Sequence, residues 1–158
     1  MDDKTHGLIG SLPRSKRSLP LSGKRHFTPT EANRALVLVK RIVTDLISTY
    51  PKLLDSQETC EVAERGGRHA DKEIARREVI AAGESIRTCL DELEQVGVEL
   101  RDWALGIVDF PCKAAGREVR LCWRWGEPAV QHWHEVEEGF ALRRPIETLL
   151  AEELSLAR

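Results

Sequence analysis

The chain has 158 residues, of which 41% are hydrophobic and 32% charged, and its formal net charge is −2. That length suits one domain, and that composition favours amphipathic helices with solvated outer faces over a sandwich of short strands. No stretch approaches the roughly 20 apolar residues of a membrane-spanning helix, and the N-terminus has no apolar segment of signal-peptide length. We therefore expect a cytoplasmic protein without a membrane anchor, with its four cysteines reduced.

The N-terminal segment is basic and differs in composition from the rest of the chain. Residues 1–26 carry six Lys and Arg side chains against two Asp, so the remainder is acidic. Its Ser, Pro and Gly content predicts a disordered tail. Scattered basic residues with no aromatic among them are weak support for binding to phosphate backbones, so nucleic acid is not an expected partner.

The ordered chain is expected to begin at Phe27, immediately before a long helix. In FTPTEAN, Thr28 is placed as the N-cap, Pro29 as the first helical residue and Glu31 as the acidic member of a capping box. Pro51 predicts a kink or an end, since proline removes one hydrogen bond of a helix interior. The apolar residues that recur in steps of three and four are Ala32, Leu36, Val39, Ile42, Val43, Leu46, Ile47 and Tyr50.

A second helix is predicted from about His69 to Val96, after the break at Gly66 and Gly67 and before a C-capping Gly97. Its apolar stripe comprises Ile74, Ile86, Leu90, Leu93 and Val96. Two long stripes separated by one glycine break predict an antiparallel helical hairpin. A narrow stripe on a long helix often continues into a partner, so we expect a homodimer formed by coiled-coil contacts between hairpins.

After Gly97 the sequence consists of short segments rich in residues that favour β-strands, namely GVEL, GIVDFP and REVRLCWRW. Ala115 and Gly116 are a predicted turn between the last two segments. The sequence thus predicts a mainly helical α+β fold. A small antiparallel sheet of two or three strands packs on the hairpin within a single domain, 27–146. Residues 147–158 are expected to form a short C-terminal helix or a frayed tail.

Residues 123–145 combine aromatic and ionisable side chains, which is typical of a ligand pocket. Three of the four tryptophans lie within eleven residues of one another. The alternative is that these rings join the sheet to the helices and that the charges are solvated. The candidate ligand-binding residues are Asp109, Trp123, Arg124, Glu127, Trp133, His134, Arg143 and Arg144.

His132 and His134 are spaced so that both imidazoles would point to one face of a strand, and Glu138 follows. This pattern resembles the first metal motif of cupins, but the later glycine and the long run of strands are missing. Because a fourth ligand is also lacking, we predict no metal and no cofactor. There is likewise no GxSxG elbow, phosphate-cradling glycine loop or dinucleotide fingerprint.

The segments FTPTEAN, GIVDFP and REVRLCWRWGEPAVQHWHEVEEGFALRRPI resemble the uncharacterised bacterial family known as domain of unknown function 2203. The resemblance covers 27–146. It supports the architecture and implies no activity, since none is assigned to the family. It also implies that His132 stands where an aromatic residue is usual, which makes His134 the better candidate for a functional group.

Two hypotheses follow from these observations. The first is a non-catalytic binding or scaffold module that self-associates through its hairpin and binds a protein partner or a small ligand. The alternative is a small enzyme acting on an anionic small molecule. There His134 would be the acid or base, Asp109 or Glu127 would orient it, and Arg143 or Arg144 would clamp the anion.

Overall fold

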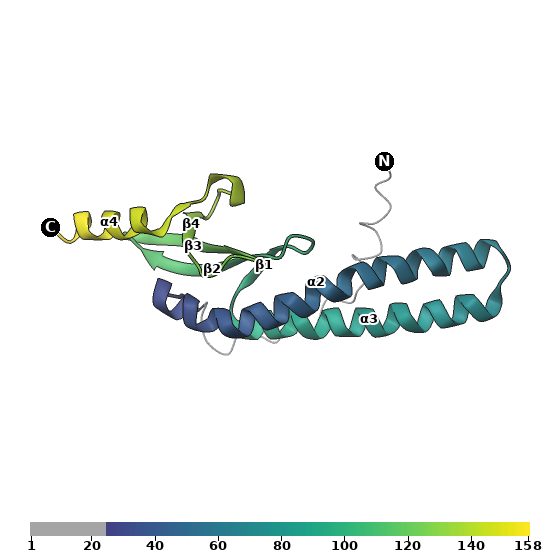
Figure 1. Cartoon of the computed structure of the whole chain (residues 1–158). Helices are drawn as coiled ribbons and strands as arrows, with labels where there is room; N and C mark the ends of the chain where they lie inside the picture. The colour runs from purple at the N-terminus through teal and green to yellow at the C-terminus, as the bar shows by residue number, and fades with distance from the viewer. Residues whose placement is uncertain (1–24) are drawn as a thin grey trace.

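The computed structural model describes residues 25–158 (Figure 1). Two long helices, α2 (Pro29–Arg65) and α3 (His69–Val96), form an antiparallel hairpin, and a sheet covers one half of it. A short helix, α4 (Ile146–Leu156), ends the chain. The predicted mainly helical α+β fold is confirmed. The predicted disordered tail lies outside the described residues, except for its last two.

The start of α2 is fixed by local hydrogen bonds, as the sequence predicted. The Thr28 hydroxyl accepts from the backbone N–H of Glu31, and the Glu31 carboxylate accepts from the N–H of Thr28. Of the two outcomes predicted for Pro51, a kink or an end, the end does not occur, because α2 continues to Arg65. Pro51 has no N–H to donate within the helix, and α2 buries further side chains beyond it. Those buried residues are Leu53, Ser56 and Ala63.

Helix α3 begins and ends as predicted, with Gly97 in the left-handed conformation (φ 95°) as its C-cap. One member of the predicted stripe is misplaced, since Ile74 is 58% exposed. Ala75 and Gly83 are buried instead. Such small residues permit close approach of two helix backbones, and a stripe read from large apolar residues alone does not include them.

The sheet has five strands rather than the two or three expected. They are β1 (Glu99–Asp102), β2 (Ile107–Ala114), β3 (Arg117–Arg124), β4 (His132–Glu135) and β5 (Arg144–Pro145). Their spatial order follows the chain, and all neighbours pair antiparallel. The two strands missed by sequence, β4 and β5, are four and two residues long, too short to show an alternating pattern.

A tight turn between β2 and β3 sets the register of the sheet. Ala115 and Gly116 both have positive φ, 52° and 75°, as a two-residue type I′ hairpin turn requires. Pairing outward from this turn places Asp109 opposite Cys122 and Phe110 opposite Leu121. Because side chains alternate between faces, the first pair projects from one face and the second from the other.

The face that carries Phe110 and Leu121 packs on the hairpin. Phe27, just ahead of α2, meets Phe110 edge-to-face with ring centroids 5.3 Å apart. Trp123 and Trp133 share this apolar core. Their indole N–H groups donate to the carbonyl of Glu127 and the hydroxyl of Thr148, at 3.0 and 2.8 Å. Within residues 25–158, no helix is both long and apolar enough to cross a bilayer.

Candidate functional site

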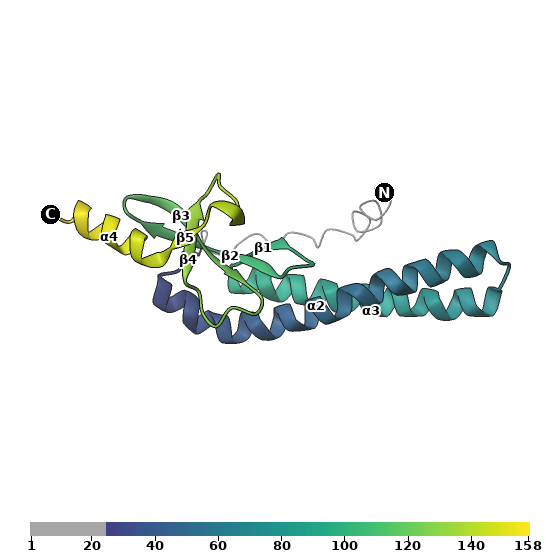
Figure 2. The same cartoon turned by 45° about the horizontal axis from the view of Figure 1, so that its top comes forward.

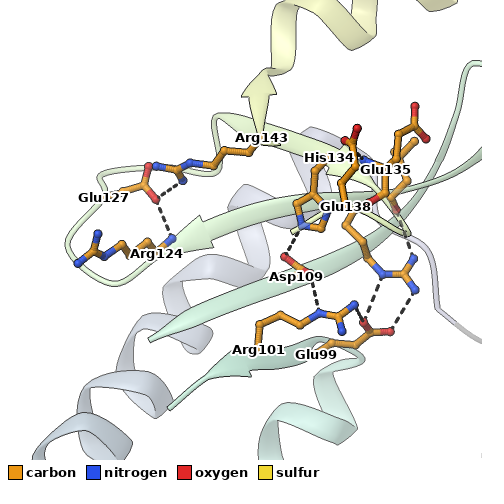
Figure 3. A network of polar contacts seen from close by, with 11 residues as sticks. Glu99, Arg101, Asp109, Arg124, Glu127, His134, Glu135, Glu138 and Arg143 are labelled. Carbon is orange, nitrogen blue, oxygen red and sulfur yellow. Dashed lines mark hydrogen bonds and ion pairs between the residues drawn. The ribbon is translucent and has the colours of Figure 1, made fainter. Parts of the chain in front are cut away.

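The opposite face of the sheet carries a buried polar cluster (Figure 3). Asp109 on β2 is 1% exposed and His134 on β4 is 2% exposed. The Nε2 atom of His134 lies 3.1 Å from one Asp109 oxygen, and its Nδ1 atom lies 2.7 Å from the backbone carbonyl of Glu135. Arg101 on β1 donates from Nε to the other Asp109 oxygen at 2.8 Å. Three strands therefore contribute to one hydrogen-bonded unit.

These contacts fix the tautomer of His134. A carbonyl oxygen only accepts, so Nδ1 carries a hydrogen and donates it to Glu135, and Nε2 shares a second proton with Asp109. Burial works to lower the pKa of His134. The hydrogen bonds to Asp109 and Glu135, with the charge of Asp109, outweigh burial and raise that pKa above the ordinary histidine value. His134 therefore holds its second proton more strongly than a histidine in water does.

The pair is the end of a longer chain of alternating charges along the same face. This series of ion pairs runs through Glu118, Arg120, Glu99, Arg101 and Asp109. Arg120 is only 4% exposed, and its guanidinium donates to the carboxylates on both sides of it, at 2.7 and 3.2 Å. Buried charges need partners of this kind, since an unpaired charge would cost several kcal/mol of folding free energy. A protonated His134 would add a positive charge next to Asp109 and so continue the series of alternating charges.

Cys122 on β3 completes the cluster. One ligand atom each from Asp109, Cys122 and His134 lies within 4.8 Å of the others, and all three residues are buried. Burial, followed by the charge of Asp109, raises the pKa of the Cys122 thiol to about 12, although the nearby Arg143 acts in the opposite direction. Cys122 is thus a protonated thiol at neutral pH and is not a nucleophile by itself.

A cavity of ≈ 490 Å³ adjoins this cluster. Asp109 and His134 line it, together with Arg101, other residues of β1 and β2, and the segment 136–140 that follows β4. The lining also carries the carboxylates of Asp102, Glu137 and Glu138. Among the described residues of the lining, four carboxylates thus face one guanidinium and one imidazole, so the electrostatic potential of the cavity favours positive charge.

Of the eight residues predicted as candidates, the structure brings Asp109 and His134 into the cavity. Trp123 and Trp133 lie in the apolar core on the other side of the sheet, as the packing alternative had it. Arg124 is exposed, with its guanidinium 6.0 Å from the centre of the Phe140 ring.

The other candidates pair with one another or with a neighbouring acid. Arg143 donates to Glu127 at 2.7 Å and stacks over Phe140, with its guanidinium carbon 4.0 Å from the ring centre. Arg144 donates to Glu138 at 2.7 Å. Neither arginine belongs to the cavity lining, so the guanidinium at the cavity is that of Arg101 instead.

The His-x-His pair does not form the ligand set that its spacing suggested. The Nδ1 atom of His132 lies 3.5 Å from Glu127, and Glu138 is engaged by Arg144, while His134 lies with Asp109. The sequence analysis missed Cys122 as a neighbour of Asp109. The signal was nevertheless available, because a two-residue turn at 115–116 pairs Asp109 with Cys122 when residues are counted outward from it.

Fold and site define a mainly helical α+β protein with a buried Asp–His–Cys cluster beside a small cavity. The model of the family described as "Uncharacterized conserved protein (DUF2203)" matches residues 25–146. The chain belongs to this family, which confirms the resemblance seen in the sequence. No curated protein and no solved structure matched the chain.

Proposed function

We propose that the chain is a binding protein for a small ligand with a positively charged or hydrogen-bond-donating group, and that the cavity beside Asp109 is its binding site. The observation that carries the proposal is a buried carboxylate that lines a cavity while His134 and Arg101 hold it in place. Ionisable groups buried against a cavity, with shifted pKa values, are typical of functional sites.

Asp109 is the better recognition group of the buried pair. Both ring nitrogens of His134 are already engaged, one by Asp109 and one by Glu135. Asp109 is contacted by Arg101, His134 and the Cys122 thiol, and the two oxygens of a carboxylate together offer four lone pairs. Asp109 thus keeps acceptor capacity for a ligand, whereas His134 would first have to give up a partner. This argues against the acid–base role considered for His134.

The charge of the cavity also favours a cation over the anion that the sequence suggested. Arg101 is the one guanidinium of the lining within residues 25–158, and its Nε and Nη2 atoms already donate to Asp109 and Glu99. The apolar walls come from Ile107, Val136 and Phe140. A small amine with a short hydrocarbon part would match both features.

A matched pair of probes tests this proposal. We expect n-butylammonium to shift the backbone amide resonances of β2 and β4 in heteronuclear NMR titrations, and butyrate, of similar size, to leave them unshifted. Asp109→Asn should abolish the response, because the amide removes the charge at nearly constant volume. Asp55→Asn, the same change at an exposed site on α2, should preserve it. Equal binding of the two probes, or binding of neither, would overturn the proposal.

A second candidate function is self-association through the hairpin. One specific observation favours it: the far half of α2 and α3 extends beyond the sheet (Figure 2), and it exposes Val62, Ile74 and Ile80. We expect native mass spectrometry to give a dimer that Ile74→Asp converts to a monomer. Val37→Asp, on the half beside the sheet, should leave the dimer intact. A monomeric wild-type protein would exclude this function.

We also propose a cytoplasmic location. Cys60, Cys89, Cys112 and Cys122 are all free thiols, and free thiols are the usual state of cysteine in a reducing compartment. Cell fractionation with an antibody to the chain would check it. Recovery in a membrane or secreted fraction would contradict the proposal.

A further inference from the structure

The side chains of Asp109, Cys122 and His134 converge from three neighbouring strands, β2, β3 and β4. Their ligand atoms lie within 4.8 Å of one another, and the nearest Asp–His pair is 3.1 Å apart. In a tetrahedral zinc site with bonds of about 2.0–2.3 Å, ligand atoms lie about 3.5 Å apart. Small side-chain rotations would therefore bring the three atoms to coordination distance.

The contacts around these residues are those of oriented metal ligands. His134 donates its Nδ1 hydrogen to the Glu135 carbonyl, which directs Nε2 toward Asp109. Metal-bound histidines usually have their second nitrogen held in this way. Arg101 binds Oδ2 of Asp109 and so leaves Oδ1, the oxygen nearest His134, for an ion.

We propose that Asp109, Cys122 and His134 bind a divalent transition-metal ion, with Zn²⁺ as the best match, and that this ion occupies the cation position of the cavity, for which the amine serves as a probe. The inference rests on the proposed function, because it names the ligand of that same site. A thiolate, an imidazole and a carboxylate together select a borderline-soft ion and disfavour Mg²⁺ and Ca²⁺.

The position of the cavity gives such an ion a chemical role. Three protein ligands leave one position of a tetrahedral ion for water or another molecule, which is the arrangement of catalytic rather than structural zinc sites. Asp109 and His134 line the cavity, so that position is reachable from it. The bound ion would supply Lewis-acid chemistry there.

Charge balance is compatible with metal binding in this buried place. The ion enters with two positive charges. A metal binds both groups deprotonated, so one proton would leave the Cys122 thiol and the proton between His134 and Asp109 would leave as well. The net charge of the cluster is then unchanged, so the ion pair between Arg101 and Asp109 is preserved.

Cobalt is the probe for the first test, because a Co²⁺–thiolate bond gives a charge-transfer absorption band. We expect metal-free full-length protein to bind one Co²⁺ per chain with this band, and one Zn²⁺ to displace it. Cys122→Ser should remove the band, with Cys122→Ala as a second variant should the first not fold. His134→Gln should weaken binding by more than about 100-fold, since even the outer partner of a ligand contributes about 10- to 100-fold.

The chain provides a matched control for each ligand. Cys112 is also buried on β2 but projects from the helix-facing side, opposite Val119. His132 is on the same strand as His134 but lies against Glu127. Cys112→Ser and His132→Gln should both retain the band. Loss of the band in Cys112→Ser with retention in Cys122→Ser would overturn the proposal, as would absence of stoichiometric Co²⁺ and Zn²⁺ binding by folded wild-type protein.

The amine probe separates failure of this inference from failure of the proposed function. Cys122 does not belong to the cavity lining, so n-butylammonium should bind metal-free wild type and Cys122→Ser alike. Zn²⁺ should displace the amine from wild type and not from Cys122→Ser. Amine binding with no metal binding would overturn the metal site alone. Absence of both would overturn the metal site and the proposed function together.

Discussion

Gly106, between β1 and β2, lies where the sheet contacts α2, and we expect Gly106→Ala to destabilise the protein strongly. The residue has a φ of +67°. A Cβ atom at this position would lie 2.7 Å from Cδ1 of Ile47 and from Cβ of Trp125, and 2.9 Å from Cγ1 of Val43. Ile47 can turn its terminal methyl away, but the Cβ of Trp125 moves only with the backbone.

The magnitude has two parts. The left-handed conformation costs an alanine about 1–2 kcal/mol of folding free energy. Forcing one extra carbon into a packed contact costs about 1–3 kcal/mol more. The free energy of unfolding should therefore fall by about 2–5 kcal/mol, a large fraction of the about 5–15 kcal/mol typical of a domain.

Urea unfolding followed by tryptophan fluorescence measures this change, and Gly116→Ala is its control. Gly116 has a similar φ of +75°, but a Cβ atom there would meet nothing within 4 Å. That variant should lose only the conformational part, about 1–2 kcal/mol. Equal destabilisation by the two substitutions would refute the reasoning, because it would mean that Gly106 is not in close contact with α2.

Three further outcomes are expected. Alkylation by iodoacetamide should be fast at Cys60, the one cysteine that is not buried, and should reach Cys122 only after unfolding. Peptide mass mapping would show which cysteine is labelled, and rapid labelling of Cys122 would contradict its burial. Thr28→Ala should lower the free energy of unfolding by about 1 kcal/mol in urea titrations, since it removes the N-cap oxygen; an unchanged midpoint would contradict the capping box. Arg117 donates to Glu135 and thereby lowers the pKa of the Glu135 carboxyl. The stability that this ion pair contributes is therefore fully present above the pKa of Glu135 in the unfolded chain, and it is lost as the pH falls through the lowered pKa in the folded protein. The difference in melting temperature between wild type and Arg117→Met should therefore become smaller as the pH is lowered. A difference that grows on acidification would contradict the lowered pKa of Glu135.

Features fixed by neighbouring residues could be predicted from the sequence. The capping box at Thr28, the left-handed Gly97 and the turn at Ala115 and Gly116 each depend on residues within a few positions. Ile74 was misplaced because the burial of a helical residue also depends on which face the partner helix covers. Hydrophobicity alone favoured Ile74 over Ala75, but the close packing of α2 and α3 selected the smaller residue.

Two residues of the candidate site were among those predicted from the sequence, and its assembly was not predicted. Asp109 stood out in a β-forming segment and His134 in the later segment rich in aromatic and ionisable residues, and both line the cavity. Their convergence with Cys122 and Arg101 depends on the pairing of four strands, including β4, whose four residues give no clear periodic signal. The arginine that binds Asp109 comes from β1, far from the tryptophan-rich segment to which composition directed attention.

The sheet packs on only one half of the hairpin, so the two halves of the hairpin should differ in their dynamics. Tyr50 contacts Trp103, with ring centroids 5.9 Å apart, just before α2 reaches Pro51, and the far half of the hairpin then extends past the sheet. In that half the interface between α2 and α3 includes the small residues Ser56, Ala63, Ala75 and Gly83. Small side chains bury little apolar area, so in the monomer the tip should open and exchange its amide hydrogens with solvent while the half under the sheet stays closed.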